Sequence, residues 1–217
     1  MTISSQSFVF IGRSGCGKGT QAKLLEEYLR KTDPSKGVLY IQTGGELREF
    51  AKGQSFTQKA CKTLNEIGGL QPEFVAVYLW ISVIINKYTG NEHIIFDGTP
   101  RKYHEAVVLD SVFDFYKFGK PFILNIDISN EESVKRLLAR KRIDDGEKEI
   151  KKRLSWYETE VIPTLDYFKD NKNYNFLVID GERSVEEIHR DIIGKIGLKG
   201  VEEQSVKDKV GRVKGVK

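Results

Sequence analysis

The sequence predicts an α/β protein built on a five-stranded parallel sheet with helices on both faces. Three observations lead to this prediction. Short runs of apolar, β-branched and aromatic residues recur along the chain, segments with helical spacing separate them, and glycine or polar residues follow several runs. Near-continuous apolar strands are typical of parallel sheets buried on both faces. The 217 residues are enough for one domain with a sizeable core and small inserted lobes.

The expected elements alternate along the chain, as a parallel sheet with crossover helices requires. The apolar runs expected as strands are residues 8–11, 38–41, 93–96, 122–128 and 175–179. The segments expected as helices are residues 19–31, 72–88, 102–115, 131–141, 147–168 and 185–196. Pro72 suits the first turn of its helix, and Ser184 suits an N-cap. The main domain is therefore expected over residues 1–198.

The charge distribution gives no argument for nucleic acid. The formal net charge is +4, and residues 199–217 hold six basic against three acidic residues, so the rest of the chain is nearly neutral. Residues 199–217 also lack aromatic side chains, and we expect a disordered basic tail there. Contact of this tail with RNA or a membrane is the weaker alternative.

No segment is expected to span a membrane, and no structural metal is expected. The most apolar helical segment, residues 74–86, is about a dozen residues long, below the ~20 that a bilayer requires. Cys16 and Cys61 lie far apart without metal or redox spacing, and no signal peptide precedes the first strand. These observations favour a reduced, cytoplasmic location.

A glycine-rich loop connects the first strand to the first helix. Residues 12–20 read Gly-Arg-Ser-Gly-Cys-Gly-Lys-Gly-Thr, which is Gly-x-x-x-x-Gly-Lys with the hydroxyl residue one position late. Such a loop turns successive backbone N–H groups toward phosphate oxygens, and the helix N-terminus adds partial positive charge. Lys18 supplies a mobile cation. The strand–loop–helix context therefore predicts a nucleotide-phosphate site rather than a plain glycine-rich turn.

Further polar residues follow the second and third strands, at the edge where parallel sheets bind ligands. Thr43 and Gly44 come after the second strand, and Asp97 and Gly98 come at the end of the third. A carboxylate opposite a phosphate loop suits Mg²⁺ or its water shell. The alternative for Asp97 is a cap on the following turn.

Arginines near these strand ends suit the charge of several phosphates held together. The candidates are Arg48, Arg101, Arg136, Arg140, Arg142 and Arg153. Arg142 and Arg153 are eleven residues apart, about three helical turns, and would share a face if the chain between them were helical. Asp144 and Asp145 could fix these arginines or cap a helix. Any single arginine could instead be an ordinary surface residue.

Taken together and in order, these segments resemble those of the adenylate kinase family. Residues 12–21 are similar to its glycine loop, including the Lys-Gly-Thr-Gln order, and residues 43–48 to its Thr-Gly-Asp-x-Leu-Arg segment. Residues 96–101 are similar to its Asp-Gly-Phe/Tyr-Pro-Arg, residues 142–145 with Arg153 to its Arg-x-Asp-Asp and following arginine, and residues 178–181 to its closing strand and turn. The resemblance covers about residues 7–197.

The resemblance implies a P-loop kinase fold that moves the γ-phosphoryl group of ATP to a nucleoside monophosphate, most simply AMP, with Mg²⁺. It also implies a monomer, a monophosphate lobe at about residues 43–71 and a short lid at about residues 137–147. The implied catalytic residues are Lys18, Arg101, Arg136, Arg142 and Arg153. The implied ATP-binding residues are Gly15, Cys16, Gly17, Lys18, Gly19, Thr20, Arg136 and Arg140. The implied monophosphate-binding residues are Thr43, Gly44, Arg48, Gln71, Asp97, Gly98, Arg101, Glu105, Arg142 and Arg153. Thr20 and Asp97 would organise Mg²⁺ directly or through water.

Several positions depart from the family pattern. Only Lys141 separates Arg140 from Arg142, so the lid would be very short. We then expect either that ATP hydrolysis leaks or that another group closes the site; alternatively, only one of the two arginines reaches phosphate. Gly45 replaces an aspartate, and Ser14 and Thr99 replace a proline and an aromatic residue. We expect a divergent member of the family.

Glu105 stands where the family has the glutamine that reads adenine. A glutamine amide both donates and accepts, whereas a carboxylate only accepts. Glu105 would therefore suit a base with two donors, such as guanine, or would need a proton or a water molecule to serve adenine. Alternatively, it is a surface glutamate without a base contact. The acceptor could thus be GMP or UMP/CMP instead of AMP, and a nucleotide-binding regulatory protein without turnover is a further alternative.

Overall fold

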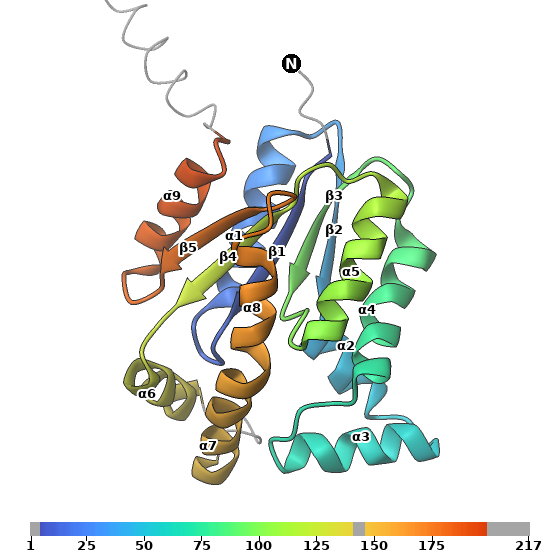
Figure 1. The fold of residues 1–217 in the computed structure, drawn as a ribbon, viewed down its shortest axis with the longest axis vertical. Coiled ribbons are helices and arrows are strands. Elements are labelled where there is room, and N and C mark those ends of the chain that lie inside the picture. Colours follow the sequence, from blue (N-terminus) through green and yellow to red (C-terminus); the bar gives the residue numbers. More distant parts are fainter. Residues whose placement is uncertain (1–4, 141–145, 199–217) are drawn as a thin grey trace, which may run out of the picture.

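The computed structural model describes residues 5–140 and 146–198, and its strands form one parallel sheet (Figure 1). The strand order is β2-β3-β1-β4-β5, and all four neighbouring pairs are parallel. The strands are β1 (Ser7–Gly12), β2 (Gly37–Gln42), β3 (Glu92–Asp97), β4 (Phe122–Asp127) and β5 (Asn175–Asp180). The predicted sheet is confirmed.

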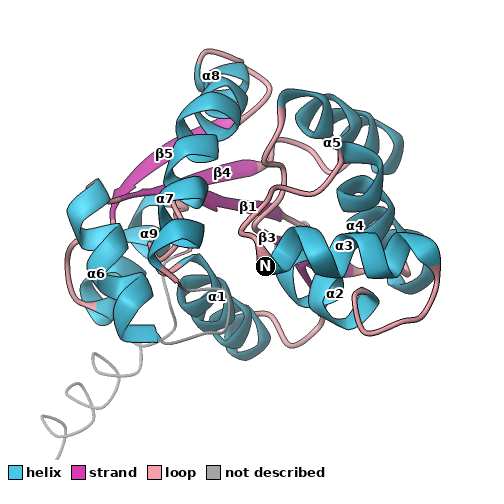
Figure 2. Cartoon of the chain, turned by 90° about the horizontal axis from the view of Figure 1, so that it is seen from below, coloured by secondary structure: helices cyan, strands magenta, loops and turns pink. Residues whose placement is uncertain are grey.

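Alternate side chains of each strand enter two separate cores, which explains why the strands are apolar throughout. Phe8 and Phe10 of β1 pack in a core with residues of α1 (Lys18–Thr32) and α9 (Val185–Lys195). Val9 of β1 packs on the other face with residues of α4 (Glu73–Lys87), α5 (Tyr103–Tyr116) and α8 (Ile162–Lys169). Figure 2 shows the sheet between these two helical layers.

Two short helices, α2 (Thr43–Phe50) and α3 (Phe56–Glu66), lie in a segment for which we predicted no helix. Gly44 and Gly45 lower the helix propensity of α2. The helix forms nevertheless because its Leu47 and Phe50 pack against a small core formed with α4. For α3 the sequence did carry a signal: Ser55 and Gln58 form a capping box at its N-terminus.

The predicted helix over residues 147–168 is interrupted. The chain forms α7 (Glu147–Trp156), a π-helical turn η1 (Tyr157–Val161) and then α8. Pro163 has no N–H to offer the carbonyl four residues earlier, and the preceding Ile162 N–H instead donates to the Tyr157 carbonyl, five residues back. The wider turn is thus the local response to Pro163.

The chain between positions 142 and 153 does not form one unbroken helix. The helix α6 spans Asn130–Arg140, and Gly146, which directly precedes α7, is extended. The condition on which Arg142 and Arg153 were expected to share a face, an unbroken helix between them, is therefore not met. Arg142 itself, most of the proposed lid and the basic tail lie outside the described residues.

Two further sequence expectations can be compared with the structure. Cys16 and Cys61 are both buried and free. Among residues 5–140 and 146–198, no helix is both long and apolar enough to cross a bilayer. The helix α4, which carries the most apolar segment, buries Val75, Leu79 and Trp80, but Phe74 and Ile85 remain exposed.

Candidate active site

A cavity of about 1080 Å³ opens beyond the carboxyl ends of the strands, where α2, α3, α6 and α7 gather (Figure 1). This is the edge at which α/β sheets place their ligands. The sequence-predicted site residues that line the cavity are Gly15, Gly17, Lys18, Gly19, Thr20, Gly44, Arg48, Asp97, Gly98, Arg101, Arg136, Arg140 and Arg153. Segments far apart in sequence therefore meet in one site.

The phosphate loop is closed on itself around Lys18. The Nζ atom of Lys18 donates to the carbonyl oxygens of Gly12 at 2.6 Å and Arg13 at 2.8 Å, and contacts Cys16 Sγ at 3.4 Å. Gly17, with φ +95°, takes the left-handed conformation that lets the loop enter α1. The cation is thus held by the carbonyl oxygens of its own loop.

Arg13 anchors the loop to the rest of the fold. Its Nε donates to the Ile128 carbonyl at 3.1 Å, and its Nη1 pairs with Glu158 Oε1 at 2.7 Å. The Arg13 guanidinium also lies 4.2 Å from the centre of the Tyr157 ring. The π-helical turn η1 thus supplies two of the three partners that fix the loop.

Asp97 is held rigidly at the end of β3. Its side chain is buried, and Oδ2 accepts from the Tyr40 hydroxyl at 2.8 Å and from Gln42 Nε2 at 3.0 Å. Burial and the Asp97 charge raise the pKa of Tyr40, so this hydroxyl remains a donor at neutral pH. A Cβ atom at Gly19 would lie 3.2 Å from Asp97 Oδ2, so there is little space between the loop and this carboxylate.

Asp97 and Thr20 fit the needs of a magnesium ion bound with nucleotide. Both line the cavity, beside the loop that faces phosphate. In the described part of the chain no three His, Cys, Asp or Glu side chains form a metal cage. Mg²⁺ in phosphoryl-transfer sites keeps several waters and takes most other ligands from phosphate, so one carboxylate and one hydroxyl match this chemistry.

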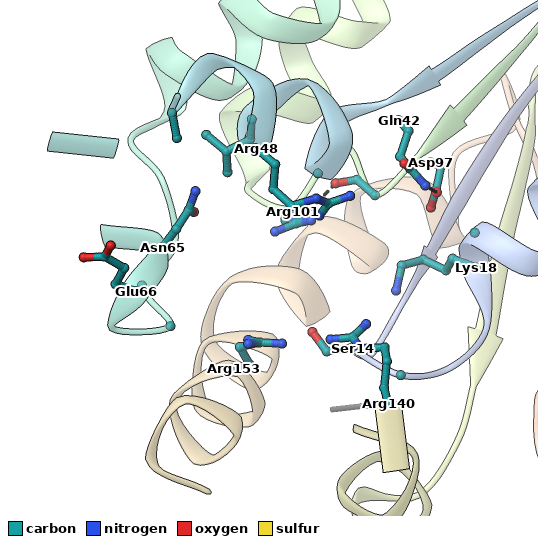
Figure 3. Close-up of a pocket in the computed structure, with 18 of the residues that line it drawn as sticks. Ser14, Lys18, Gln42, Arg48, Asn65, Glu66, Asp97, Arg101, Arg140 and Arg153 are labelled. Atoms are coloured by element: carbon teal, nitrogen blue, oxygen red, sulfur yellow. Dashed lines mark hydrogen bonds between the residues drawn. The ribbon is translucent and has the colours of Figure 1, made fainter. Parts of the chain in front are cut away.

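Three guanidinium groups face the loop across the cavity. Figure 3 shows Arg48, Arg101 and Arg153 pointing into it, opposite Lys18 and Asp97. Burial lowers the pKa of Arg101, the negative charges of Glu105 and Asp97 oppose that change, and the positive charges of Arg153 and Arg48 add to it. Because the three cations repel one another, an anion placed between them is strongly favoured.

Arg136 and Arg140 approach from α6 on the loop side. Arg136 is half-buried, and its Nε donates to Glu132 Oε1 at 2.7 Å, one helical turn earlier. Arg140 is exposed at the last position of α6. Both line the cavity on the side of the phosphate loop.

Four other predicted residues do not line the cavity. Cys16 is fully buried beneath the phosphate loop, and Thr43 is buried at the start of α2. The Gln71 amide is also buried and donates to the Cys61 carbonyl and to Asn65 Oδ1, both at 3.0 Å. The fourth residue is Glu105. The two hydrogen bonds of Gln71 therefore hold the loop after α3 to that helix.

Glu105 is buried, so its interpretation as a surface glutamate is wrong. Its Oε2 atom accepts from the Thr99 hydroxyl and from the Arg101 N–H, both at 3.2 Å. Burial raises the pKa of Glu105, while the hydrogen bonds and the charge of Arg101 oppose that rise. Thr99 and Glu105, which both depart from the family pattern, are thus joined by a hydrogen bond.

Sequence reasoning missed several lining residues. Gln42 ends β2 and bonds to Asp97, and its position directly after a strand was a usable signal. Trp156 comes three residues after Arg153 on α7, and nothing local marked it.

The glycine at position 45 has a structural explanation, because a Cβ atom there would lie 2.9 Å from Gln42 Oε1. The aspartate of the family pattern would require the Gln42 amide to move.

A loop for phosphates, a fixed carboxylate and facing arginines on a parallel α/β sheet define a P-loop nucleotide kinase. Comparison with known proteins is more specific. The family model described as adenylate kinase matches residues 10–173. The chain is 31% identical to "Adenylate kinase 1" of Nostoc sp., over 87% of this chain and 97% of that protein.

Two further relatives give the same result. The chain is 31% identical to "Adenylate kinase" of Leptospira biflexa, over 87% of this chain and 98% of that protein. It is 32% identical to "Adenylate kinase" of Parabacteroides distasonis, over 83% and 92% respectively. The chain belongs to the adenylate kinase family and is a kinase that transfers phosphoryl groups to a nucleoside monophosphate.

Proposed function

We propose that the protein transfers the γ-phosphoryl group of ATP to AMP and forms two molecules of ADP. The observation that carries this proposal is the placement of Lys18 opposite Arg48, Arg101 and Arg153 in one cavity. Such a site holds two phosphate chains end to end with their charges neutralised. Positioning and charge neutralisation are the main requirements of phosphoryl transfer.

In the proposed reaction an oxygen of the AMP phosphate attacks the γ-phosphorus of ATP. The new P–O bond forms as the bond to the β–γ bridging oxygen breaks, and that oxygen leaves with ADP. Lys18 follows the transferred group, while Arg101 and Arg48 hold the acceptor phosphate and Arg153 faces the transferring group. Asp97 and Thr20 would hold Mg²⁺ beside the nucleotide, and the ion would supply additional neutralisation of charge.

Two moving parts are proposed to exclude water. The acceptor lobe spans about residues 43–71 and includes α2 and α3. The lid spans about residues 137–147 and brings Arg140 and Arg142 to ATP. A lid this short covers ATP incompletely and lets some water into the site. We therefore expect some ATP hydrolysis without acceptor. We propose that the protein acts as a monomer in the cytoplasm.

AMP is proposed as the acceptor because the curated relatives are named adenylate kinases. Oε2 of Glu105 is already occupied by Thr99 and Arg101, which favours a role in holding the Arg101 loop over reading the base. Discrimination by the base is then weaker than with a glutamine at this position. GMP, UMP or CMP as the main acceptor remains the second candidate, carried by the carboxylate at position 105.

A substrate panel tests this proposal. ADP formation is measured in a coupled assay with ATP and each of AMP, GMP, CMP and UMP, with and without Mg²⁺. We expect the highest kcat/KM with AMP and no turnover without the metal ion. A higher kcat/KM with GMP would support the second candidate, whereas nucleotide binding without acceptor-dependent turnover would support a regulatory protein.

A further inference from the structure

Trp156 is the last residue of α7 and lines the cavity from the same helix face as Arg153. Glu149, Arg153 and Trp156 are spaced four and three residues apart, so they lie above one another on that face. Trp156 is half-buried, and its ring packs against the core around α4, α5 and α8. The indole is therefore fixed on one side and open to the site on the other.

The first polar contact of Trp156 reaches the loop that follows α3. The indole Nε1 donates to the Gly68 carbonyl at 3.3 Å. Gly68 has φ +64°, and a Cβ atom there would lie 2.9 Å from the Glu149 Cα. The backbone of this loop thus rests directly on α7, and the Trp156 N–H ties it there.

The second contact of Trp156 is with Arg101. The guanidinium carbon lies 5.7 Å from the centre of the Trp156 ring, within the range of cation–π attraction. Arg101 is fixed from the other side, because its Nε donates to the Gly98 carbonyl at 2.8 Å. The indole therefore limits the directions in which the Arg101 guanidinium can point.

We propose that Trp156 is a positioning residue for the acceptor phosphate. The Trp156 side chain sets the orientation of Arg101 and holds the loop at Gly68 against α7. The arginine and the acceptor lobe are therefore aligned by the same residue. This inference rests on the proposed function, in which Arg101 binds the acceptor phosphate. Trp156 itself does not touch the reacting atoms in this role.

Steady-state kinetics of two variants test the proposal. Trp156→Phe keeps an aromatic ring but loses the N–H, and we expect the KM for AMP to rise about fivefold, the effect of one hydrogen bond. Trp156→Leu loses both contacts, and we expect a rise of about twentyfold. The KM for ATP should stay within about twofold, because the donor loop lies across the cavity. Ser155→Ala, an exposed neighbour on α7, is the control and should leave both KM values unchanged.

Fluorescence gives an independent readout. The chain has two tryptophans, and Trp80 is fully buried in the core. We expect AMP to change the emission of the wild type and to leave that of Trp156→Phe unchanged. A KM for AMP unaltered in active Trp156→Leu, or an AMP response that persists in Trp156→Phe, would overturn the proposal. No turnover of any monophosphate by the wild type would instead contradict the proposed function, so the two failures are distinct.

Discussion

The two halves of the site are built from different materials. The centre of the donor half is a continuous stretch of backbone, residues 12–20, with Lys18 bonded to the carbonyls of its own loop. The acceptor half is assembled from side chains of α2, α7 and the segment after β3, which meet only in the folded chain. A backbone site is determined by its own segment, whereas a side-chain site depends on the packing of several elements.

The largest effect is expected on the donor side. Lys18→Ala removes the only lysine of the phosphate loop, and kcat should fall about 1000-fold because a preorganised cation is lost from the transferring phosphate. Lys31→Ala, an exposed position in the last turn of α1, should be neutral. Measured kcat within tenfold of the wild type would show that the loop is not the donor site.

The acceptor side is tested by Arg101→Lys. A lysine keeps the charge but loses the planar fork that binds phosphate with two parallel hydrogen bonds, so the KM for AMP should rise about thirtyfold with little change for ATP. Arg190→Lys on the exposed face of α9 is the matched control. An equal rise of both KM values would mean that the two halves of the site are not separate.

Gly68→Ala tests the contact between the loop after α3 and α7. The new Cβ atom would collide with the Glu149 backbone, and we expect about a tenfold rise in the KM for AMP together with a loss of about 1–2 kcal/mol in stability. Gly90 has φ +98° with open space around its Cβ position. Gly90→Ala should therefore cost stability through backbone strain without changing the KM.

The smallest effect is expected in stability and concerns Glu105. Because burial raises its pKa in the folded state, the carboxyl group contributes stability below its ordinary pKa of 4.5, and this contribution is lost as pH rises through the raised value. Glu105→Gln cannot ionise. The Tm of the variant relative to the wild type should therefore increase from pH 4 to pH 7, and a decrease over this range would contradict the account.

The same division explains how far the sequence could predict the structure. The sheet and the phosphate loop followed from local patterns, since the apolar runs and the Gly-x-x-x-x-Gly-Lys spacing act through the segment that carries them. The interruption at Tyr157–Val161 was missed, although Pro163 was visible within the predicted helix. Helix α2 was missed because tertiary packing of Leu47 and Phe50 outweighs two glycines.

On the acceptor side the sequence identified the arginines but not their supports. Arg48, Arg101 and Arg153 could be predicted from family motifs, and each lines the cavity. The contacts of Trp156 with Gly68 and Arg101 join residues 88 and 55 positions apart, which no local pattern encodes. The pairing of Glu105 with Thr99 likewise needed the fold to reveal it.

The central claim is that one cavity passes a phosphoryl group between two nucleotides. Phosphorus NMR of the purified wild-type protein with ATP, AMP and Mg²⁺ tests this claim directly. We predict that ATP and AMP disappear in equal amounts, that two ADP form for each pair, and that inorganic phosphate stays minor. Release of inorganic phosphate with AMP left unconsumed would contradict the account.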